Sequence, residues 1–305
     1  MIHILQIVTP VFIVLLLGWF IRRINLIDGD FIRTANRLIF NVCLPVLLFY
    51  KISAADLRAV FSVNHLLIML TAIVIIFVIS YSAAKLFKMG NSAGTFSMNS
   101  FRGNYAYMGL PVSAYAYGDP GLIIGSVLMA FIVPSVNLAS VTALSMSMSS
   151  GRSFKPFLKN TLLNPLAIAC LLGLAASWLE LGFPTFIDRS LAIISGVTLP
   201  LALFCVGGSM TKEQMTGGFA PSIATSAIKL ILMPLTVFAI LKLTGMEFTT
   251  TSKTLVIMLS APTATVNYVM ASQMQGDAPL AGSTIVISTL LSIFTFSIWL
   301  FILGI

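Results

Sequence analysis

The chain has 305 residues, of which 58% are hydrophobic and only 9% are charged. A soluble domain carries about 25% charged residues, because its surface faces water. This composition excludes a soluble enzyme or a nucleic-acid-binding domain and predicts that most of the surface faces lipid. We attribute the net charge of +8 to the excess of Lys and Arg that membrane proteins carry in their cytoplasmic loops.

Ten segments resemble membrane-spanning helices, which need about 20 mostly apolar residues each. The first has neither the basic start nor the cleavage site of a signal peptide, so we expect a helix there. Short connections leave no room for an inserted soluble domain. The sequence therefore predicts an all-α membrane protein with ten transmembrane helices. Their approximate ranges are 4–21, 34–50, 63–84, 93–117, 121–148, 157–179, 186–210, 219–241, 254–275 and 280–303.

The basic residues predict the orientation of these helices. Cytoplasmic loops carry more Lys and Arg than external loops. Nine basic residues fall in odd-numbered loops: Arg22, Arg23, Arg33, Lys85, Lys88, Arg152, Lys155, Lys159 and Lys212. Five fall in even-numbered loops: Lys51, Arg58, Arg189, Lys242 and Lys253. We therefore expect the odd loops in the cytoplasm and, since the number of helices is even, both termini outside.

Prolines at matching places indicate that the halves 1–150 and 151–305 are repeats. Pro10 in the first predicted helix and Pro165 in the sixth are 155 positions apart. The same offset relates Pro45 in NVCLPVLLF, which starts at Asn41, to Pro200 in GVTLPLALF. Chance similarity between apolar helices is the alternative, but several matches in register favour a duplication.

A further match, Gly118-Asp119 with Gly276-Asp277, has an offset of 158 and requires one short insertion. Each repeat contains five helices, and an odd number forces the second copy to enter from the opposite side. Inverted repeats are typical of secondary transporters, which bind their substrate near the bilayer midplane between the repeats.

The fourth and ninth predicted helices are unusually polar, and both contain proline. Pro111, preceded by Gly109, and Pro262 predict helix breaks, because proline removes a backbone hydrogen bond. A half-helix that starts at a break offers free N–H groups and a positive dipole end to a carboxylate. An ordinary packing kink is the alternative. The polar candidates for substrate binding in these helices and the fifth are Asn104, Asn137, Thr263, Thr265 and Asn267.

Two basic residues, Arg102 and Lys229, lie near the predicted midplane. A cation at this depth costs several kcal/mol, about 3 on insertion scales, and often has a function. Each therefore either attracts an anionic substrate or extends its long side chain to the interface.

The sequence provides no candidate for catalysis or for a metal. No Asp or Glu lies deep in a predicted helix, and the GxGD motif of intramembrane aspartyl proteases is absent. We expect no enzyme activity and no cofactor. Coupling to Na⁺ through backbone carbonyls, to a proton on the substrate, or to no ion all remain open. Export of an anion from a negative-inside cell needs no coupling ion, which favours efflux or uniport.

Several motifs resemble the auxin efflux carrier family. RGNYAYMGLPV, which contains Asn104 and Pro111, resembles its fourth-helix motif. NVCLPVLLF, LPLALFCVGGSM, and the run from APTATVNYVMA through PLAGSTIVISTLLS resemble its second, seventh, and ninth-to-tenth helices. The short loop SGRSFKP resembles the compact prokaryotic branch, which includes malonate and malate carriers. This resemblance implies a location in the bacterial cytoplasmic membrane and a fold similar to that of bile acid/sodium symporters.

The resemblance also implies how the protein works. Helices 1, 2, 6 and 7, with Asn41, Pro45 and Pro200 as motif residues, would form a scaffold that dimerises through helices 2 and 7. Helices 3–5 and 8–10 would form a mobile domain of an elevator-type carrier, in which helices 4 and 9 are broken and cross. Asn104, Pro111, Pro262 and Asn267 would bind a small organic anion, such as a mono- or dicarboxylate. A coupled symporter, or a channel or receptor of the same fold, is the alternative.

Overall fold

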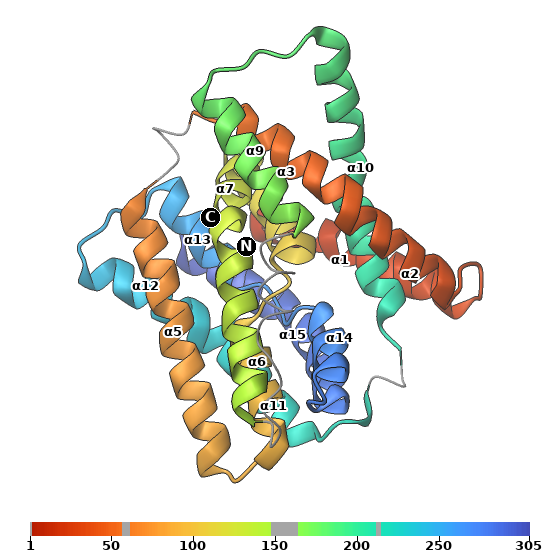
Figure 1. Ribbon diagram of the computed structural model, residues 1–305, viewed down its shortest axis with the longest axis vertical. Helices are drawn as coiled ribbons and strands as arrows, with labels where there is room; N and C mark the ends of the chain where they lie inside the picture. Colours follow the sequence, from red (N-terminus) through yellow and green to blue (C-terminus); the bar gives the residue numbers. More distant parts are fainter. Residues whose placement is uncertain (1, 57–61, 148–163, 212–214) are drawn as a thin grey trace.

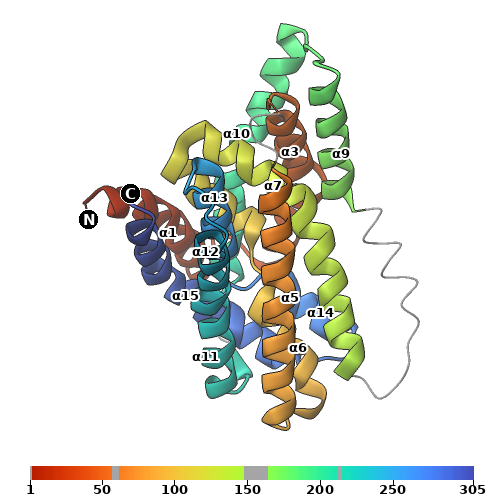
Figure 2. The ribbon, with the colours of Figure 1, turned by 90° about the vertical axis from the view of Figure 1, so that its left-hand side faces the viewer.

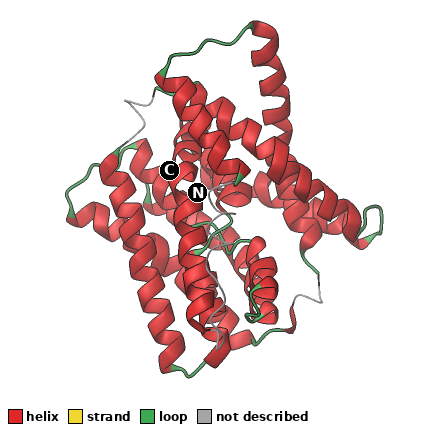
Figure 3. Ribbon diagram, in the orientation of Figure 1, coloured by secondary structure: helices red, strands yellow, loops and turns green. Residues whose placement is uncertain are grey.

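The computed structural model describes residues 2–56, 62–147, 164–211 and 215–305. Within these ranges all regular elements are helices (Figures 1 and 3), which confirms the predicted all-α class. The residues outside include the first part of the predicted sixth helix, 157–163. They also include five of the basic residues used for the orientation: Arg58, Arg152, Lys155, Lys159 and Lys212.

The first half of the chain forms three long helices and three shorter ones of nine or ten residues. These are α1 (Ile2–Arg23), α2 (Gly29–Leu38), α3 (Leu44–Ser53), α5 (Val63–Leu86), α6 (Ala93–Phe101) and α7 (Leu110–Ser147). The π-helical segment η1 (Ile39–Cys43) joins α2 to α3 without a break, and η3 (Tyr105–Gly109) leads directly into α7.

The second half has a similar succession of helices. These are α9 (Pro165–Trp178), α10 (Thr185–Ser209), α11 (Phe219–Ala227), α12 (Met233–Leu243), α13 (Thr250–Leu259), α14 (Val266–Gln273) and α15 (Ala278–Ile302). The π-helical segment η5 (Ile228–Leu232) joins α11 to α12.

Each of the three π-helical segments ends two residues before a proline, namely Pro45, Pro111 or Pro234. Proline has no N–H to donate to the preceding turn, and the wider turn accommodates the missing bond. Before Pro111, for example, the N–H of Gly109 donates to the carbonyl of Asn104 at 3.2 Å. The helix therefore continues through Gly109 and Pro111, and the prediction that it breaks at these two residues is wrong.

The long helix α7 consists of two helices that meet at Gly118. Gly118 has φ 65° and ψ −151°, a conformation that essentially only glycine adopts without strain. This glycine turns the chain between the predicted fourth and fifth helices, 93–117 and 121–148.

Within the described residues, seven helices are long and apolar enough to cross a membrane. They are His3–Arg23, Gly29–Ser53, Val63–Leu86, Tyr105–Ser147, Thr185–Ser209, Phe219–Leu243 and Ala278–Ile302. The difference from ten has three causes: the predicted fourth and ninth helices are interrupted, the fourth and fifth are merged across Gly118, and α9 has only 14 described residues. The protein is thus a multi-pass membrane protein, while the ten-helix inverted repeat stays a prediction.

Two helix pairs pack closely, α1 against α10 and α3 against α9. Helices α3 and α9 lie side by side in Figures 1 and 2. Glycines allow the backbones of α1 and α10 to touch. A Cβ atom on Gly18 would overlap the carbonyl oxygen of Phe204, and one on Gly207 would overlap that of Leu15. Small residues serve this purpose between membrane helices, because lipid-exposed helices associate through close packing.

Replacing Gly207 with Ala should therefore destabilise the protein by about 1–3 kcal/mol, the usual cost of overpacking. Gly196→Ala is the matched control on the same helix, since nothing lies within 4 Å of a Cβ atom there. The control should be neutral or more stable by about 0.5–1 kcal/mol, because Ala favours a helix. Thermal unfolding in detergent measures both, and equal midpoints for the two variants would contradict the close packing of α1 and α10.

Candidate functional site

The predicted fourth and ninth helices are both interrupted inside the molecule. Helix α6 ends at Phe101, and the chain is helical again from Tyr105. Helix α13 ends at Leu259, and α14 begins at Val266. The non-helical residues of the first interruption are 102–104, seven or more positions before Pro111, whereas those of the second include Pro262.

The two interruptions lie against each other and share backbone hydrogen bonds. Gly103 and Thr263 form an antiparallel bridge. The N–H of Asn104 donates to the carbonyl of Pro262 at 2.6 Å, and the N–H of Ala264 donates to the carbonyl of Arg102 at 3.1 Å. Backbone groups that a broken helix would leave unpaired are costly in a membrane. Here each interruption satisfies groups of the other.

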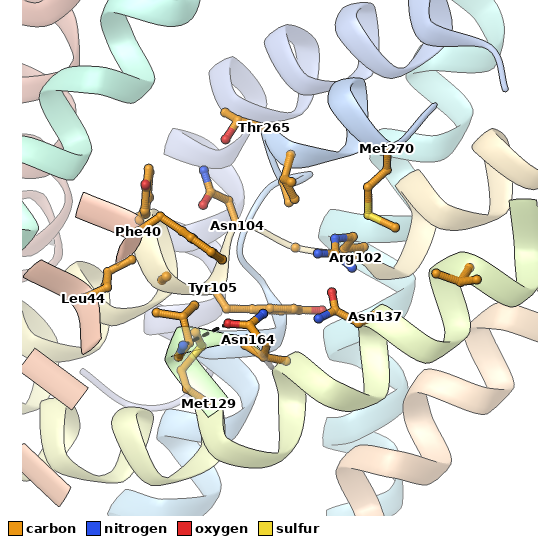
Figure 4. Close-up of a pocket in the computed structure, with 18 of the residues that line it drawn as sticks. Phe40, Leu44, Arg102, Asn104, Tyr105, Met129, Asn137, Asn164, Thr265 and Met270 are labelled. Atoms are coloured by element: carbon orange, nitrogen blue, oxygen red, sulfur yellow. Dashed lines mark hydrogen bonds between the residues drawn. The ribbon is translucent and has the colours of Figure 1, made fainter. Parts of the chain in front are cut away.

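A cavity of about 440 Å³ lies beside this crossing (Figure 4). Its apolar walls include Phe40, Leu44, Met129, Val133 and Met270. Its polar lining comes from both halves of the chain: Arg102, Asn104, Tyr105, Asn137, Asn164, Thr265 and Gln273. Among the described residues no Asp or Glu lines the cavity. The lining thus carries one cation and several amides.

Arg102 is the charged residue of this lining. Its side chain is only 9% exposed. Its Nη1 donates to two neutral acceptors, the carbonyl of Val136 at 3.3 Å and the hydroxyl of Ser140 at 3.2 Å. In the described part of the chain its Nε has no partner and no carboxylate pairs with it. A buried cation without a counter-ion is expensive, so the cavity favours an anion.

Asn104 and Asn137 offer their side chains to the same cavity. The backbone of Asn104 is held by the crossing, while its amide makes no side-chain hydrogen bond within the described residues. The amide of Asn137, from α7, likewise has none there and lies near Arg102 in Figure 4. An amide supplies two donors and an acceptor, so both residues can bind a carboxylate. Thr265, which the sequence also predicted as a substrate-binding residue, lines the cavity as well.

Lys229 neither faces the substrate cavity nor extends to the membrane interface, the two positions expected from the sequence. It is fully buried, so it does not reach the interface, and it does not line the cavity. Its Nζ donates to the carbonyl of Leu259, the last residue of α13, at 2.7 Å. It also lies 5.3 Å from the centre of the Tyr105 ring. A cation at the negative end of a helix is favourable, which makes Lys229 a support of the crossing.

Thr263 and Asn267 also support the crossing and do not line the cavity. Both are fully buried. The hydroxyl of Thr263 donates to the carbonyl of Asn99 at 3.0 Å, and the amide of Asn267 donates to the side-chain oxygen of Asn99 at 3.1 Å. The prolines Pro111 and Pro262 are absent from the lining as well.

The structure adds site residues that the sequence did not single out, above all Asn164. This residue directly precedes Pro165 at the start of α9, and its side-chain oxygen caps the helix by accepting from the N–H of Leu166 at 2.9 Å. Asn followed by Pro at a helix start is a recognisable capping signal, but only the tertiary fold brings it to the cavity. Tyr105 was missed for the same reason.

A second cavity, of about 430 Å³, lies between α1, α3, α7 and α10. Pro200 and Lys51 line it, and Lys51 forms an ion pair with Asp119 at 2.7 Å. Lys51 and Asp119 belong to even-numbered loops, so this cavity lies toward the side predicted to face outside. The other two motif residues line neither cavity: Asn41 donates to the carbonyl of Arg37 at 2.8 Å, and Pro45 lies at the start of α3.

Secondary transporters typically have interrupted helices that cross beside a polar cavity, within an apolar multi-pass bundle. The described residues hold no group of three or more side chains suited to a metal ion. The fold and the site thus define a membrane transporter.

The comparisons with known proteins agree with this class. Residues 3–300 match the family model described as membrane transport protein. The chain therefore belongs to this family, that of the auxin efflux carriers, as the motifs predicted. It is a transporter and not an enzyme.

Curated relatives match over nearly their whole length. The chain is 26% identical to an "Uncharacterized transporter" of Methanothermobacter thermautotrophicus, over 96% of both chains. It is 25% identical to a "Putative malonate transporter" of Rhizobium meliloti, over 97% of this chain and 94% of the relative. It is 26% identical to the "Uncharacterized transporter YfdV" of Escherichia coli, over 96% and 95%.

Proposed function

We propose that the protein is a secondary carrier of a small organic anion in a bacterial cytoplasmic membrane. The observation that carries this proposal is the buried guanidinium of Arg102, which lines a cavity without any Asp or Glu among the described residues. The amides of Asn104 and Asn137, which make no side-chain hydrogen bond within the described residues, complete a set of donors for a carboxylate. Lipid surrounds the bundle, and no nucleic acid is involved.

A carboxylate of small or moderate size fits this site. The volume of about 440 Å³ is at the small end of the range of about 300–1,000 Å³ for ligand sites. One relative bears the name of a malonate transporter, so malonate is our first test substrate. Longer dicarboxylates and auxin-like acids are the next ones.

Repeat-equivalent contacts support the proposed inverted repeat. Gly18 contacts Phe204, and Gly173 contacts Phe49; the offset of 155 converts one contact into the other. A two-fold axis also brings equivalent residues together. Thr198 donates to the carbonyl of Cys43 at 3.1 Å, and these two residues share the same offset.

The crossing of the interrupted helices supports the offset of 158 positions between the later parts of the two repeats. Asn104 and Pro262, 158 positions apart, bind each other directly through their backbones. Such a repeat allows each half to adopt the conformation of the other, which is the basis of alternating access. Both cavities are lined by residues of the proposed scaffold (helices 1, 2, 6 and 7) and by residues of helices 3–5 and 8–10, which fits an elevator-type motion of the second group along the first.

We further propose a homodimer through the second and seventh helices, with odd loops in the cytoplasm and both termini outside. The exposed apolar side chains on α2 and α10, such as Phe31, Ile193 and Val197, support an apolar contact there. A dimeric mass in mild detergent and in nanodiscs is expected. A monomeric mass in both would contradict the dimer.

Efflux or uniport fits the site best, because a monoanion that leaves a negative-inside cell gains about 2.3 kcal/mol per 100 mV. No carboxylate for proton coupling lines the cavity in the described part of the chain. Symport with Na⁺ or a proton is the alternative and would appear as flux that depends on an imposed gradient of that ion.

Flux of radiolabelled malonate into proteoliposomes tests the proposed function. A carrier saturates, and unlabelled malonate inside the vesicles accelerates the entry of labelled malonate by counterflow. A channel shows neither effect. Malonate, malate and indole acetate are to be tested in turn, and the absence of saturable flux for all three would contradict the proposal.

A further inference from the structure

The N-terminus of α9 opens at the first cavity, where Asn164 and Leu166 both belong to the lining. Asn164 has an extended backbone conformation, φ −65° and ψ 125°, and caps the helix through its side-chain oxygen. Pro165, at the first helical position, has no N–H. The start of this 14-residue helix therefore presents its positive dipole end beside the cavity.

The cap also fixes the orientation of the Asn164 amide. Its oxygen must face the N–H of Leu166, which donates to it at 2.9 Å. The two N–H donors of Nδ2 then point away from the helix, and within the described residues they have no hydrogen-bond partner. Among the described residues, the oxygen of Asn164 thus caps α9 and its nitrogen has no structural partner.

A second and independent feature of this cavity indicates an anion. Arg102 lies in the interruption that follows α6, in the first half of the chain. Its side chain is more than nine-tenths buried, and its Nε has no partner among the described residues. Figure 4 shows Arg102, Asn137 and Asn164 around the same space, with Tyr105 between them. Asn164 at the start of α9 and the guanidinium of Arg102 thus border the same cavity.

We propose that the amide nitrogen of Asn164, with the N-terminal end of α9, is the second part of the anion site and binds a carboxylate group of the substrate together with Arg102. This inference rests on the proposed function and deepens it. Arg102 lies in the proposed mobile domain and α9 in the proposed scaffold. The substrate consequently bridges the two, and its affinity depends on their relative position.

The substitution Asn164→Asp separates this role from capping. Asp caps a helix as well as Asn does, so the thermal midpoint of the variant should equal that of the wild type. The new carboxylate, however, removes the two donors and repels an anion. We expect binding of malonate to weaken at least 10-fold, because a hydrogen bond to a charged group contributes about that factor or more.

Asn164→Ser is the matched variant, since Ser also caps but is neutral and has a shorter reach. It should weaken binding by about 10-fold, because the bond to the charged group is lost, and by less than Asn164→Asp does, because Ser adds no repulsion. Equilibrium binding of radiolabelled malonate, malate and indole acetate to purified protein in detergent measures all variants. If Asn164→Asp is unstable, the Asn164→Ser result decides.

Arg102→Gln, measured alongside, distinguishes the two proposals. Reduced affinity in both Arg102→Gln and the Asn164 variants supports the shared site. Affinity within twofold of the wild type for both Asn164 variants, with a large loss in Arg102→Gln, would show that Asn164 only caps α9. Unchanged affinity in every variant, or no binding to the wild type, would overturn the proposed function as well.

Discussion

Replacing Arg102 with Gln should weaken the binding of an anionic substrate by about 30- to 5,000-fold, equivalent to about 2–5 kcal/mol for the loss of one member of a buried charge pair. The guanidinium is the cation of the cavity lining and has no carboxylate partner within the described residues. Its loss leaves the substrate's negative charge buried without compensation. Binding of radiolabelled malonate to the purified variant measures this effect.

The variant should still fold, because the groups that Arg102 binds have other partners. The hydroxyl of Ser140 donates to the carbonyl of Val136 within α7. Arg102→Lys is the control: it keeps the charge but not the planar geometry, so it should lose less affinity than Arg102→Gln. An equal loss in the two variants would mean that the charge of Arg102 is not what binds the substrate.

Replacing Asn104 with Ala should weaken substrate binding by about 10- to 150-fold, because a hydrogen bond to a charged group contributes about 1.5–3 kcal/mol. The backbone of Asn104 holds the crossing through Pro262, and this contact does not depend on the side chain. The variant should therefore keep its thermal midpoint. Asn104→Asp should bind the anion even more weakly, since it adds repulsion at the same point.

The alternative role for Asn104 is a structural hydrogen bond between helices, which contributes on average about 0.6 kcal/mol in membranes. That role predicts a small loss of stability and nearly unchanged affinity. An affinity of Asn104→Ala within threefold of the wild type would rule out its role as a ligand.

Local sequence patterns predicted the helices well, because apolar length and flanking charges act locally. The predicted ranges 63–84 and 186–210 differ by no more than two residues at either end from α5 (Val63–Leu86) and α10 (Thr185–Ser209). The turn at Gly118 is also visible in the sequence. The break in the fourth helix was misplaced because proline was taken as its cause. A wider turn accommodates Pro111, whereas the bonds with the ninth helix, distant in sequence, hold residues 102–104 open.

The same limit applies to the site. Polarity alone selected Arg102, Asn104, Asn137 and Thr265, which the fold brings to one cavity, together with Lys229 and others, which it does not. Buried polar residues of both kinds look alike in a sequence. Whether a donor meets a carbonyl, as Lys229 does, or a cavity depends on contacts across the molecule.

If the anion occupies the cavity beside the crossing, it should protect a cysteine introduced into the lining of that cavity. Val133 lines this cavity and is half-buried, while Thr250 is exposed at the start of α13 and lines neither of the two cavities described here. In a protein whose native Cys43, Cys170 and Cys205 are replaced by Ala, saturating malonate should slow alkylation of Val133→Cys at least 10-fold and leave Thr250→Cys unchanged. An unchanged alkylation rate at Val133→Cys with malonate bound would show that the anion binds outside this cavity.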